Sequence, residues 1–412
     1  MKRPPHLLVV LSAHGFGHAA QTAPVVNELR RRIPDLRLTL RSTVPHTLLR
    51  ARFEGEFEHL PTNSDIGMVM SSALDVKVEE SAEAYAQFHQ HWERRIQQEA
   101  RLLKGLAPDL LLSNVAYLPL AGAAAAGISA VAMCSLNWAD IYLHYCAPAH
   151  KPAAEGRTDS PSPLGESEAR GAQPWPEGPG EGEAARFIGS IHGSSKAGRS
   201  RPEAEEIHRQ IVEAYNSAAG FYQTEPAMPM QDIAKRRPIG PVARVGIDRR
   251  HEINERLALS DKARLVLIAP GGIALRLPVE QWPSVRDIYW IVQSDWNVNH
   301  PNVIILEQLG MHFTDVLRSC DALIGKPGYG SFAEAACNGT PVLYVKRNDW
   351  PEEPCLVDWL QRHGRCVEID RSRLGQGEVL GHLETLWALP APSPVVPSGI
   401  TQAAEYLHAY LD

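Results

Sequence analysis

The chain has 412 residues, 44% of them hydrophobic, and a formal net charge of −7 from 41 Lys and Arg against 48 Asp and Glu. This length exceeds what one ordinary core supports and predicts two domains. The mildly acidic balance argues against attraction of the whole protein to nucleic acid or an anionic membrane. The six cysteines form no C-x-x-C pair, which argues against a zinc knuckle or redox motif and suits a reducing compartment.

The chain shows no targeting or membrane-spanning signal. No charged-then-apolar leader is visible, and the longest apolar runs are far shorter than a membrane span. We therefore expect a cytoplasmic protein with no transmembrane segment, for which peripheral membrane contact stays open.

The first half alternates short apolar runs with helical segments. This alternation predicts a parallel sheet covered by helices on both faces. The expected strands are His6–Ser12, Leu36–Ser42, Leu110–Ser113 and Ile128–Cys134. The expected helices are one through Val25–Arg32, a long polar helix Glu79–Lys104, and Tyr117–Ala126.

A composition break follows at Ala147–Arg186, which is rich in Pro, Gly, Ser and Glu. Such a segment cannot bury enough apolar surface to offset its chain entropy, so we expect a disordered insertion over about residues 150–200. A helix resumes at Glu203–Tyr215, and Arg236–Gly246 has the composition of a linker.

The second half repeats the alternation and ends in a helix, Gln402–Leu411. We expect an α/β protein with two doubly wound, Rossmann-like domains facing a cleft, over residues 1–245 and 246–395. The last helix, within residues 396–412, is expected to pack back on the first domain. The strands expected in this half are Leu265–Ala269, Ile288–Gln293, Val303–Leu306, Ala322–Ile324, Val342–Val345 and Val367–Ile369.

Two histidines and two glycines follow the first strand. Gly15 and Gly17 let the backbone turn sharply and approach a ligand, and the helix that follows offers unpaired N–H groups to an anion. His18 is then placed to remove a proton from an acceptor hydroxyl, because imidazole titrates near neutrality. The alternative is a tight turn in which His18 only caps the helix.

Two other interpretations of this loop are disfavoured. The spacing G-x-G-x-x-A weakly matches a dinucleotide fingerprint, which also requires an acid at the end of the second strand. Arg41 and Ser42 stand there instead. His14 and His18 are four residues apart, but the intervening glycines argue against a helical zinc pair.

A second glycine-rich turn, Gly325–Gly330, joins a strand to a helix. Ser331 and Glu334 have the S-x-x-E spacing of a capping box, which is the structural alternative. In the functional interpretation Glu334 accepts hydrogen bonds from ribose hydroxyls, and the backbone at Gly328 and Gly330 faces a diphosphate together with the helix dipole.

The layout resembles GT-B glycosyltransferases, and within them the peptidoglycan N-acetylglucosaminyltransferase family. His18 with Gly17 matches that family's Gly-Gly-His loop, and Gly271 with Gly272 matches its second glycine turn loosely. The family's G-x-x-[ST]-x-x-E helix is matched by Gly328–Glu334.

One loop departs from that pattern. Where the family carries an Asp/Gln pair on the sugar hydroxyls, Glu352 and Glu353 stand in this chain, so the donor sugar is left open. His14–His18 and Gly325–Pro354 are also similar to the glycosyltransferase-like N-terminal region of L-arabinokinases, more closely than to the first family. No sugar-kinase phosphate loop follows.

The resemblance implies a nucleotide-sugar-dependent glycosyltransferase, inverting, with a UDP-sugar as co-substrate and an unidentified hydroxyl acceptor. His18 would be the base, His14 would position the acceptor or the diphosphate, and Asp140 would orient the imidazole. We expect no metal or other cofactor, because no D-x-D pair ends a strand.

The alternatives are a catalytically idle nucleotide-sugar-binding module that senses or scaffolds, and a nucleotide-sugar epimerase on the same fold. The leaving diphosphate would be stabilised by backbone amides of Gly328, Tyr329 and Gly330, by those of Gly271 and Gly272, and by Arg276 or Lys326.

Overall fold

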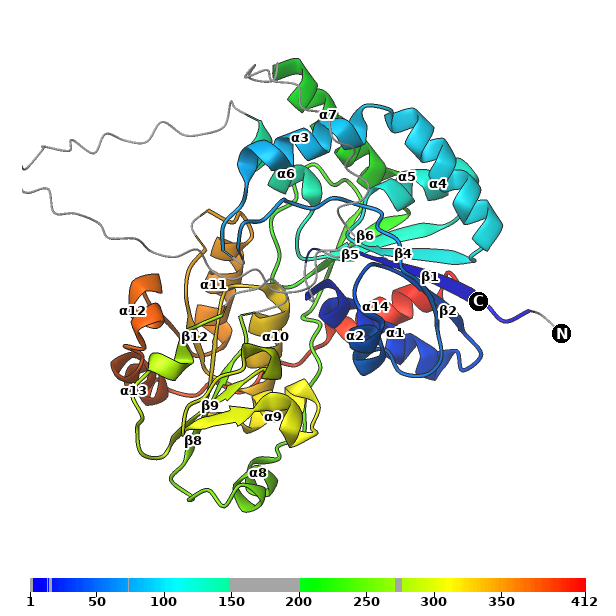
Figure 1. Cartoon of the computed structure of the whole chain (residues 1–412). Coiled ribbons are helices and arrows are strands. Elements are labelled where there is room, and N and C mark those ends of the chain that lie inside the picture. Colours follow the sequence, from blue (N-terminus) through cyan, green and yellow to red (C-terminus); the bar gives the residue numbers. More distant parts are fainter. Residues whose placement is uncertain are drawn as a thin grey trace, which may run out of the picture.

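The computed structural model describes residues 3–12, 14, 17–72, 74–147, 201–270, 276–347 and 349–412. The insertion expected near residues 150–200 lies outside the described residues, as do Gly15, Gly271 and Gly272. The described chain forms two sheets, each covered by helices, and the second half of the chain builds the second sheet (Figure 1).

The first sheet has the strand order β3-β2-β1-β4-β5-β6-β7, and its neighbouring strands all pair in parallel. The central strands β1, β4 and β5 are buried at every position, because helices cover both faces. Pro238 lies in the edge strand β7, where a missing N–H is tolerated. The strands are β1 His6–Leu11, β2 Arg37–Arg41, β3 Glu58–Leu60, β4 Leu110–Asn114, β5 Ala130–Cys134, β6 Gly220–Thr224 and β7 Arg236–Ile239.

The second sheet has the order β10-β9-β8-β11-β12-β13 and is also parallel. Both sheets reverse their strand order beside the first strand, and ligands of such sheets bind at the carboxyl ends of the strands flanking that point. The strands are β8 Arg264–Ile268, β9 Ile288–Val292, β10 Val303–Ile305, β11 Ala322–Gly325, β12 Val342–Tyr344 and β13 Cys366–Glu368.

Each sheet has a separate apolar cluster on each of its two faces. The helices that complete the clusters of the first sheet are α1 Gly17–Arg32, α2 His46–Arg52, α3 Val78–His89, α4 Trp92–Leu106, α5 Leu118–Ala126, α6 Trp138–Cys146 and α7 Arg201–Ser217. The later helices are α8 Arg250–Arg256, α9 Phe313–Ser319, α10 Tyr329–Asn338, α11 Glu353–His363, α12 Arg371–Gln376, α13 Leu380–Ala388 and α14 Gly399–His408, with short 3₁₀ turns at Val279–Gln281, Ser294–Trp296 and Leu306–Leu309.

The last helix, α14, returns from the second domain to the first and packs beside α1 (Figure 1). Ala403, Ala404 and Leu407 are fully buried in the same apolar cluster as Val26 of α1. The chain therefore crosses between the domains twice, once before β8 and once before α14. None of the described helices is long and apolar enough to span a membrane.

The structure corrects two elements. The expected long helix over 79–104 is two helices, α3 and α4, because the chain breaks at Gln90 and His91. The expected linker Arg236–Gly246 begins with strand β7, which pairs with β6 through Gln223 and Pro238. Short, exposed edge strands carry few apolar residues, so hydrophobic periodicity does not reveal them.

Candidate active site between the two domains

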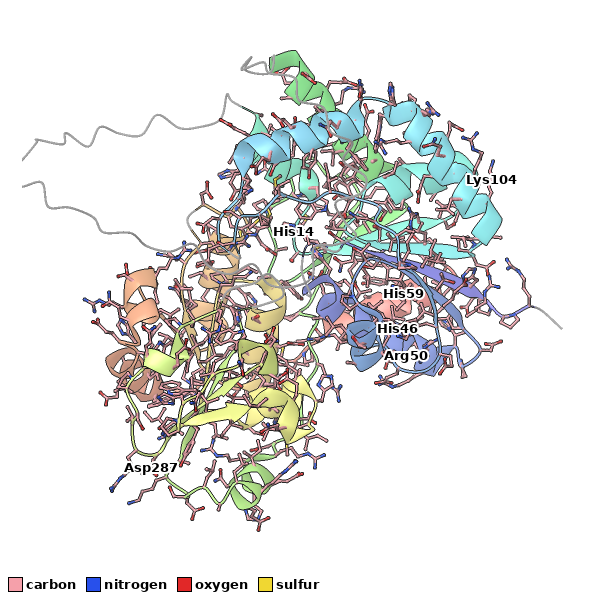
Figure 2. The ribbon with its side chains drawn as sticks, in the orientation of Figure 1. His14, His46, Arg50, His59, Lys104 and Asp287 are labelled. Carbon is pink, nitrogen blue, oxygen red and sulfur yellow. The ribbon has the colours of Figure 1, made fainter. Side chains whose placement is uncertain are left out.

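The two glycine-rich loops of the sequence meet between the domains. A pocket, here called the histidine pocket, is lined on the first domain by His14 and the start of α1, and on the second by Lys326 and the start of α10. His14 lies where the two domains face each other (Figure 2). The structure thus brings together residues that are more than 300 positions apart in the sequence.

His18 is the second residue of α1 and is held by a network of amide and hydroxyl groups. Its Nδ1 lies 2.9 Å from Oδ1 of Asn114, the last residue of β4. The Asn114 amide nitrogen donates to Oε1 of Gln21 at 2.7 Å and to the Thr22 hydroxyl at 2.9 Å. The ring therefore does not cap the helix backbone, and the capping interpretation of His18 is wrong.

The same network assigns the tautomer of His18. Because the Asn114 amide nitrogen is the donor in two bonds, its oxygen is left as an acceptor, so His18 Nδ1 carries the proton. The unprotonated nitrogen is then Nε2. Burial lowers the pKa of His18, and the bond to Asn114 offsets this only in part. The ring is therefore a neutral base at neutral pH.

His14 packs between two tryptophans. Its ring meets Trp138 edge-on at 5.1 Å and stacks on Trp350 at 5.9 Å. Burial, reinforced by His18, Arg347 and Lys326, lowers the pKa of His14 to about 3, so it is neutral. Its Nε2 is buried and has no hydrogen-bond partner among the described residues. A buried nitrogen without a partner would be satisfied by a hydrogen bond to a polar group of a ligand.

Helix α10 begins at Tyr329, with Gly328 as its N-cap, so Ser331 lies inside the first turn. The capping-box interpretation of Ser331 and Glu334 is therefore wrong. The helix approaches α1 closely: a Cβ added at Gly330 would lie 3.6 Å from Cβ of Ala20. Ser331, Gly328 and Tyr329, which the sequence analysis assigned to the donor site, line the histidine pocket.

Glu334 lies one turn further along α10 and reaches across to the first domain. Its side chain is 4% exposed, and Nη1 of Arg52 donates to its Oε1 at 3.1 Å. Burial raises the pKa of Glu334, and the neighbouring Arg52 and Arg244 oppose that shift. The Glu334 carboxylate therefore points towards Arg52 and Arg244 and does not cap its own helix.

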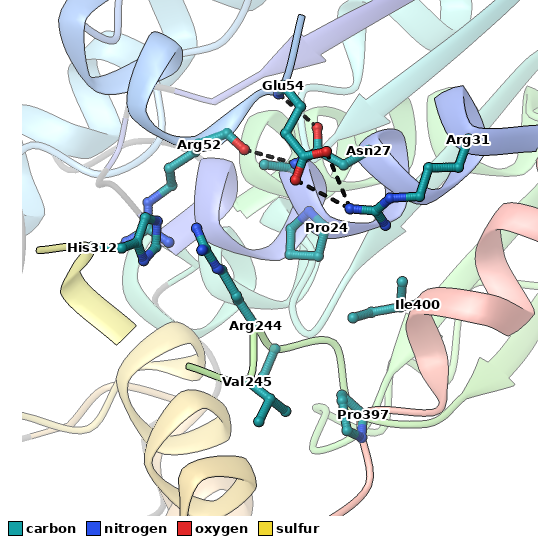
Figure 3. Close-up of a pocket in the computed structure, with 12 residues that line it drawn as sticks. Pro24, Asn27, Arg31, Arg52, Glu54, Arg244, Val245, His312, Pro397 and Ile400 are labelled. Carbon is teal, nitrogen blue, oxygen red and sulfur yellow. Dashed lines mark hydrogen bonds and ion pairs between the residues drawn. The ribbon is translucent and has the colours of Figure 1, made fainter. Parts of the chain in front are cut away.

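Arg52 belongs to a second hollow between the domains, here called the arginine pocket. It has a volume of about 410 Å³. Arg52, Arg244 and His312 stand side by side along one wall, and Pro24 and Asn27 of α1 lie opposite (Figure 3). Helix α10 thus runs from the histidine pocket, at Gly330, to the edge of the arginine pocket, at Glu334.

Two cations line the histidine pocket on the second domain. Neither the Lys326 ammonium nor the Arg347 guanidinium has an ion-pair partner within the described ranges. Burial and the neighbouring Arg347 lower the pKa of Lys326 to about 7. Unpaired buried cations are costly, so a bound anion would stabilise both.

Glu352 and Glu353 stand at the start of α11, where the loop after β12 ends. The Glu352 carboxylate accepts from the Ser135 hydroxyl at 2.6 Å and from the Trp350 indole at 3.2 Å. Glu353 accepts from the backbone N–H of Arg347 at 2.8 Å. Glu352 lines the histidine pocket and Glu353 supports the loop that forms it.

Two expected site residues lie elsewhere. The Asp140 carboxylate accepts from the side chain of Asn137, the N-cap of α6, at 2.9 Å, so Asn114 and not Asp140 holds the His18 ring. Arg276 pairs with Glu280 at 3.0 Å and donates to the Trp296 carbonyl, and it does not line the histidine pocket. Gly17 does line that pocket.

No protein-family model matches the chain. A curated relative, L-arabinokinase of Arabidopsis thaliana, is 22% identical over 378 residues. The match covers 91% of this chain but 31% of the relative, so the chain spans less than a third of that protein's length.

Solved glycosyltransferase structures align over nearly the whole chain. CalG4, the calicheamicin glycosyltransferase, has a TM-score of 0.56 at 14% identity and covers 99% of this chain and 98% of its own. A UDP-glucosyltransferase from Polygonum tinctorium has a TM-score of 0.54 at 13% identity, covering 100% and 99%. UGT89C1 of Arabidopsis thaliana, complexed with UDP, reaches 0.50 at 14% identity, covering 99% and 94%.

The chain has the GT-B fold. Both parallel sheets and the crossing of the last helix are contained in these alignments, which extend over both domains. The finer resemblance to the peptidoglycan N-acetylglucosaminyltransferases stays a prediction.

Sequence reasoning missed Asn114, Arg52 and Arg347. Asn114 did have a signal, since it is a polar residue at the carboxyl end of the buried strand beside β1. Arg52 and Arg347 are ordinary arginines in the sequence, and only the packing of the two domains gives them their neighbours.

Proposed function

We propose that the protein is a glycosyltransferase that moves a sugar from a nucleotide sugar, most simply a UDP-sugar, to an acceptor hydroxyl. The observation that carries this proposal is the line of groups along α10. The helix start faces Lys326, and Glu334 follows about 6 Å along the axis from Gly330. A diphosphate at the helix start would place its ribose beside Glu334, and UGT89C1, which shares the fold, is complexed with UDP.

The two pockets divide this donor into parts. The nucleoside end would extend from Glu334 into the arginine pocket, and the sugar would lie in the histidine pocket near Glu352. Arg52 forms an ion pair with the Glu334 carboxylate, so a bound ribose must share that carboxylate with Arg52 or displace Arg52 from it.

The chemistry follows from the tautomer of His18. Its Nε2 takes the proton of the acceptor hydroxyl as that oxygen bonds to the anomeric carbon. The bond from this carbon to the diphosphate breaks, and the diphosphate leaves with the electron pair. Attack opposite the leaving group inverts the anomeric centre. Lys326 and the backbone amides at the start of α10 stabilise the charge that develops on the leaving group.

The alternative is a catalytically idle binding module, which the Arg52–Glu334 ion pair favours because it occupies the ribose carboxylate. The first experiment is a thermal-shift screen of nucleotide sugars, since a ligand of the folded state raises its stability. Single-turnover incubation with the best ligand then separates the classes. A transferase slowly hydrolyses the donor, an idle module leaves the donor intact, and an epimerase returns an isomerised donor.

Removing the charge of Glu334 should weaken nucleotide binding. Glu334→Gln keeps the shape of the side chain but loses a charge-assisted bond to ribose, which is worth about 1–3 kcal/mol. We expect the affinity for UDP, measured by calorimetry, to fall about tenfold or more with the fold intact. Glu368→Gln, which removes a surface carboxylate paired with Lys346, is the control and should bind UDP as the parent does. Unchanged affinity in Glu334→Gln would assign the carboxylate to domain packing with Arg52.

Donor binding should depend on pH through Lys326. Its pKa of about 7 means that the free protein loses this charge as pH rises through neutrality, whereas a bound diphosphate favours the ammonium. Titration of Lys326 should therefore leave the affinity for a UDP-sugar constant below pH 7. Above pH 7 the affinity should fall by up to about tenfold per pH unit. Calorimetry in two buffers of different ionisation enthalpy should show proton uptake at pH 8 and none at pH 6. Lys326→Arg should abolish the uptake, since arginine stays charged; uptake that persists in this variant would contradict the assignment.

A further inference from the structure

Arg347 is the cation of the histidine pocket that the proposed function leaves without a task. It follows strand β12, is 7% exposed, and its guanidinium carbon lies 3.9 Å from the centre of the Trp350 ring. Its Nε is buried without a hydrogen-bond partner, and no ion pair to it is found in the described part of the chain. The side chain is thus held in place, largely desolvated, and unpaired on the side of the pocket.

The nearby carboxylates form no ion pair with the Arg347 guanidinium in the described part of the chain, although the charges of Glu352, Glu353 and Asp349 favour its protonated form. Both oxygens of Glu352 already accept hydrogen bonds, from Ser135 and from Trp350. Glu353 accepts from the backbone N–H of Arg347 rather than from its guanidinium. A planar guanidinium with unused donors is suited to bind a carboxylate through two hydrogen bonds.

Arg347 neighbours Lys326 in the same pocket, but it belongs to a different loop from the groups proposed to bind the diphosphate. Lys326 and the start of α10 follow strand β11, whereas Arg347 follows the neighbouring strand β12 on the same loop as Glu352. This loop is the one expected at the sugar. Trp350, on which Arg347 packs, also stacks on His14 of the first domain, so the guanidinium stands beside the point where sugar and acceptor would meet.

We propose that the donor sugar carries a carboxylate, as a uronic acid does, and that Arg347 binds this group. The inference rests on the proposed function, because it assigns the sugar of the same donor. The alternative occupant of Arg347 is the diphosphate itself, and a neutral sugar would leave the guanidinium desolvated and unpaired.

The test compares matched ligands by calorimetry on the full chain. Dissociation constants are measured for UDP, UDP-glucose and UDP-glucuronate, and again for the galactose and galacturonate pair. We expect at least one uronate to bind about tenfold or more tightly than its neutral counterpart, as one charge-assisted pair allows. Arg347→Gln should abolish this preference while leaving UDP affinity within about twofold of the parent. Arg362→Gln, a surface arginine paired with Asp358, is the matched control and should keep the preference.

The outcomes separate the two proposals. Equal binding of the uronate and the neutral sugar in both pairs overturns this inference alone, and it needs no variant that has to fold. A loss of UDP affinity in Arg347→Gln that equals the loss for the uronate reassigns Arg347 to the diphosphate and also overturns it. If the parent protein binds neither UDP nor any UDP-sugar, the proposed function falls and this inference with it. Arg347→Lys, which keeps the charge without the planar pair of donors, should retain part of the preference.

Discussion

Replacing His18 with alanine is expected to slow sugar transfer by about 10²–10⁴-fold, the usual contribution of a general base. The reason lies in the geometry of the ring: Asn114 holds Nδ1 as a donor and leaves Nε2 free to take a proton. Nucleotide binding should be nearly unchanged, because the groups proposed to hold the diphosphate and ribose lie on the second domain. Hydrolysis of the nucleotide-sugar donor provides the assay, since the acceptor is unidentified.

Asp140→Asn is the control for this experiment. Asp140 bonds to Asn137 at the start of α6 and does not hold the His18 ring, so donor hydrolysis should proceed at the parent rate. If Asp140→Asn abolishes hydrolysis while His18→Ala does not, the base has been assigned to the wrong residue. If the parent protein itself does not hydrolyse the donor, the alternative of an idle binding module is favoured instead.

Replacing Lys326 with glutamine is expected to lower the affinity for UDP by about 10- to 100-fold. A hydrogen bond to a charged group is worth about 1.5–3 kcal/mol, and Lys326 has no competing ion pair among the residues that the structure describes. The variant should also be at least as stable as the parent without ligand, because a desolvated ammonium is removed from the pocket. Calorimetry and thermal unfolding measure the two effects.

Arg276→Gln is the matched loss of charge on the same domain. Sequence reasoning gave Arg276 and Lys326 the same task, but Arg276 pairs with Glu280 and donates to a backbone carbonyl. We expect UDP affinity in this variant to stay within about twofold of the parent. A larger loss in Arg276→Gln than in Lys326→Gln would return the diphosphate contact to the loop that contains residues 271–275.

The architecture could be predicted because it depends on local patterns. Continuous apolar runs such as His6–Leu11 and Ala130–Cys134 are buried on both faces, and they appear in the sequence as strands between helices. The edge strands β3 and β7 escaped notice since each lies at an edge of the sheet and most of their residues are exposed or half-buried. The break between α3 and α4 has no proline or glycine to signal it.

The sequence by itself determined the α/β class, the glycine-rich turn Gly325–Gly330, the placement of His18 at the start of one helix, and that of Glu334 about one turn into another. These features depend on residues a few positions apart, whose relative positions the backbone fixes. Only the tertiary structure decided that Asn114 holds His18, that Arg52 meets Glu334, and that Arg347 packs on Trp350 with no ion pair to the described residues. The first two contacts join groups from separate strands or domains. The surroundings of Arg347 likewise depend on how sheets and helices pack, and no local pattern in the chain encodes such distances.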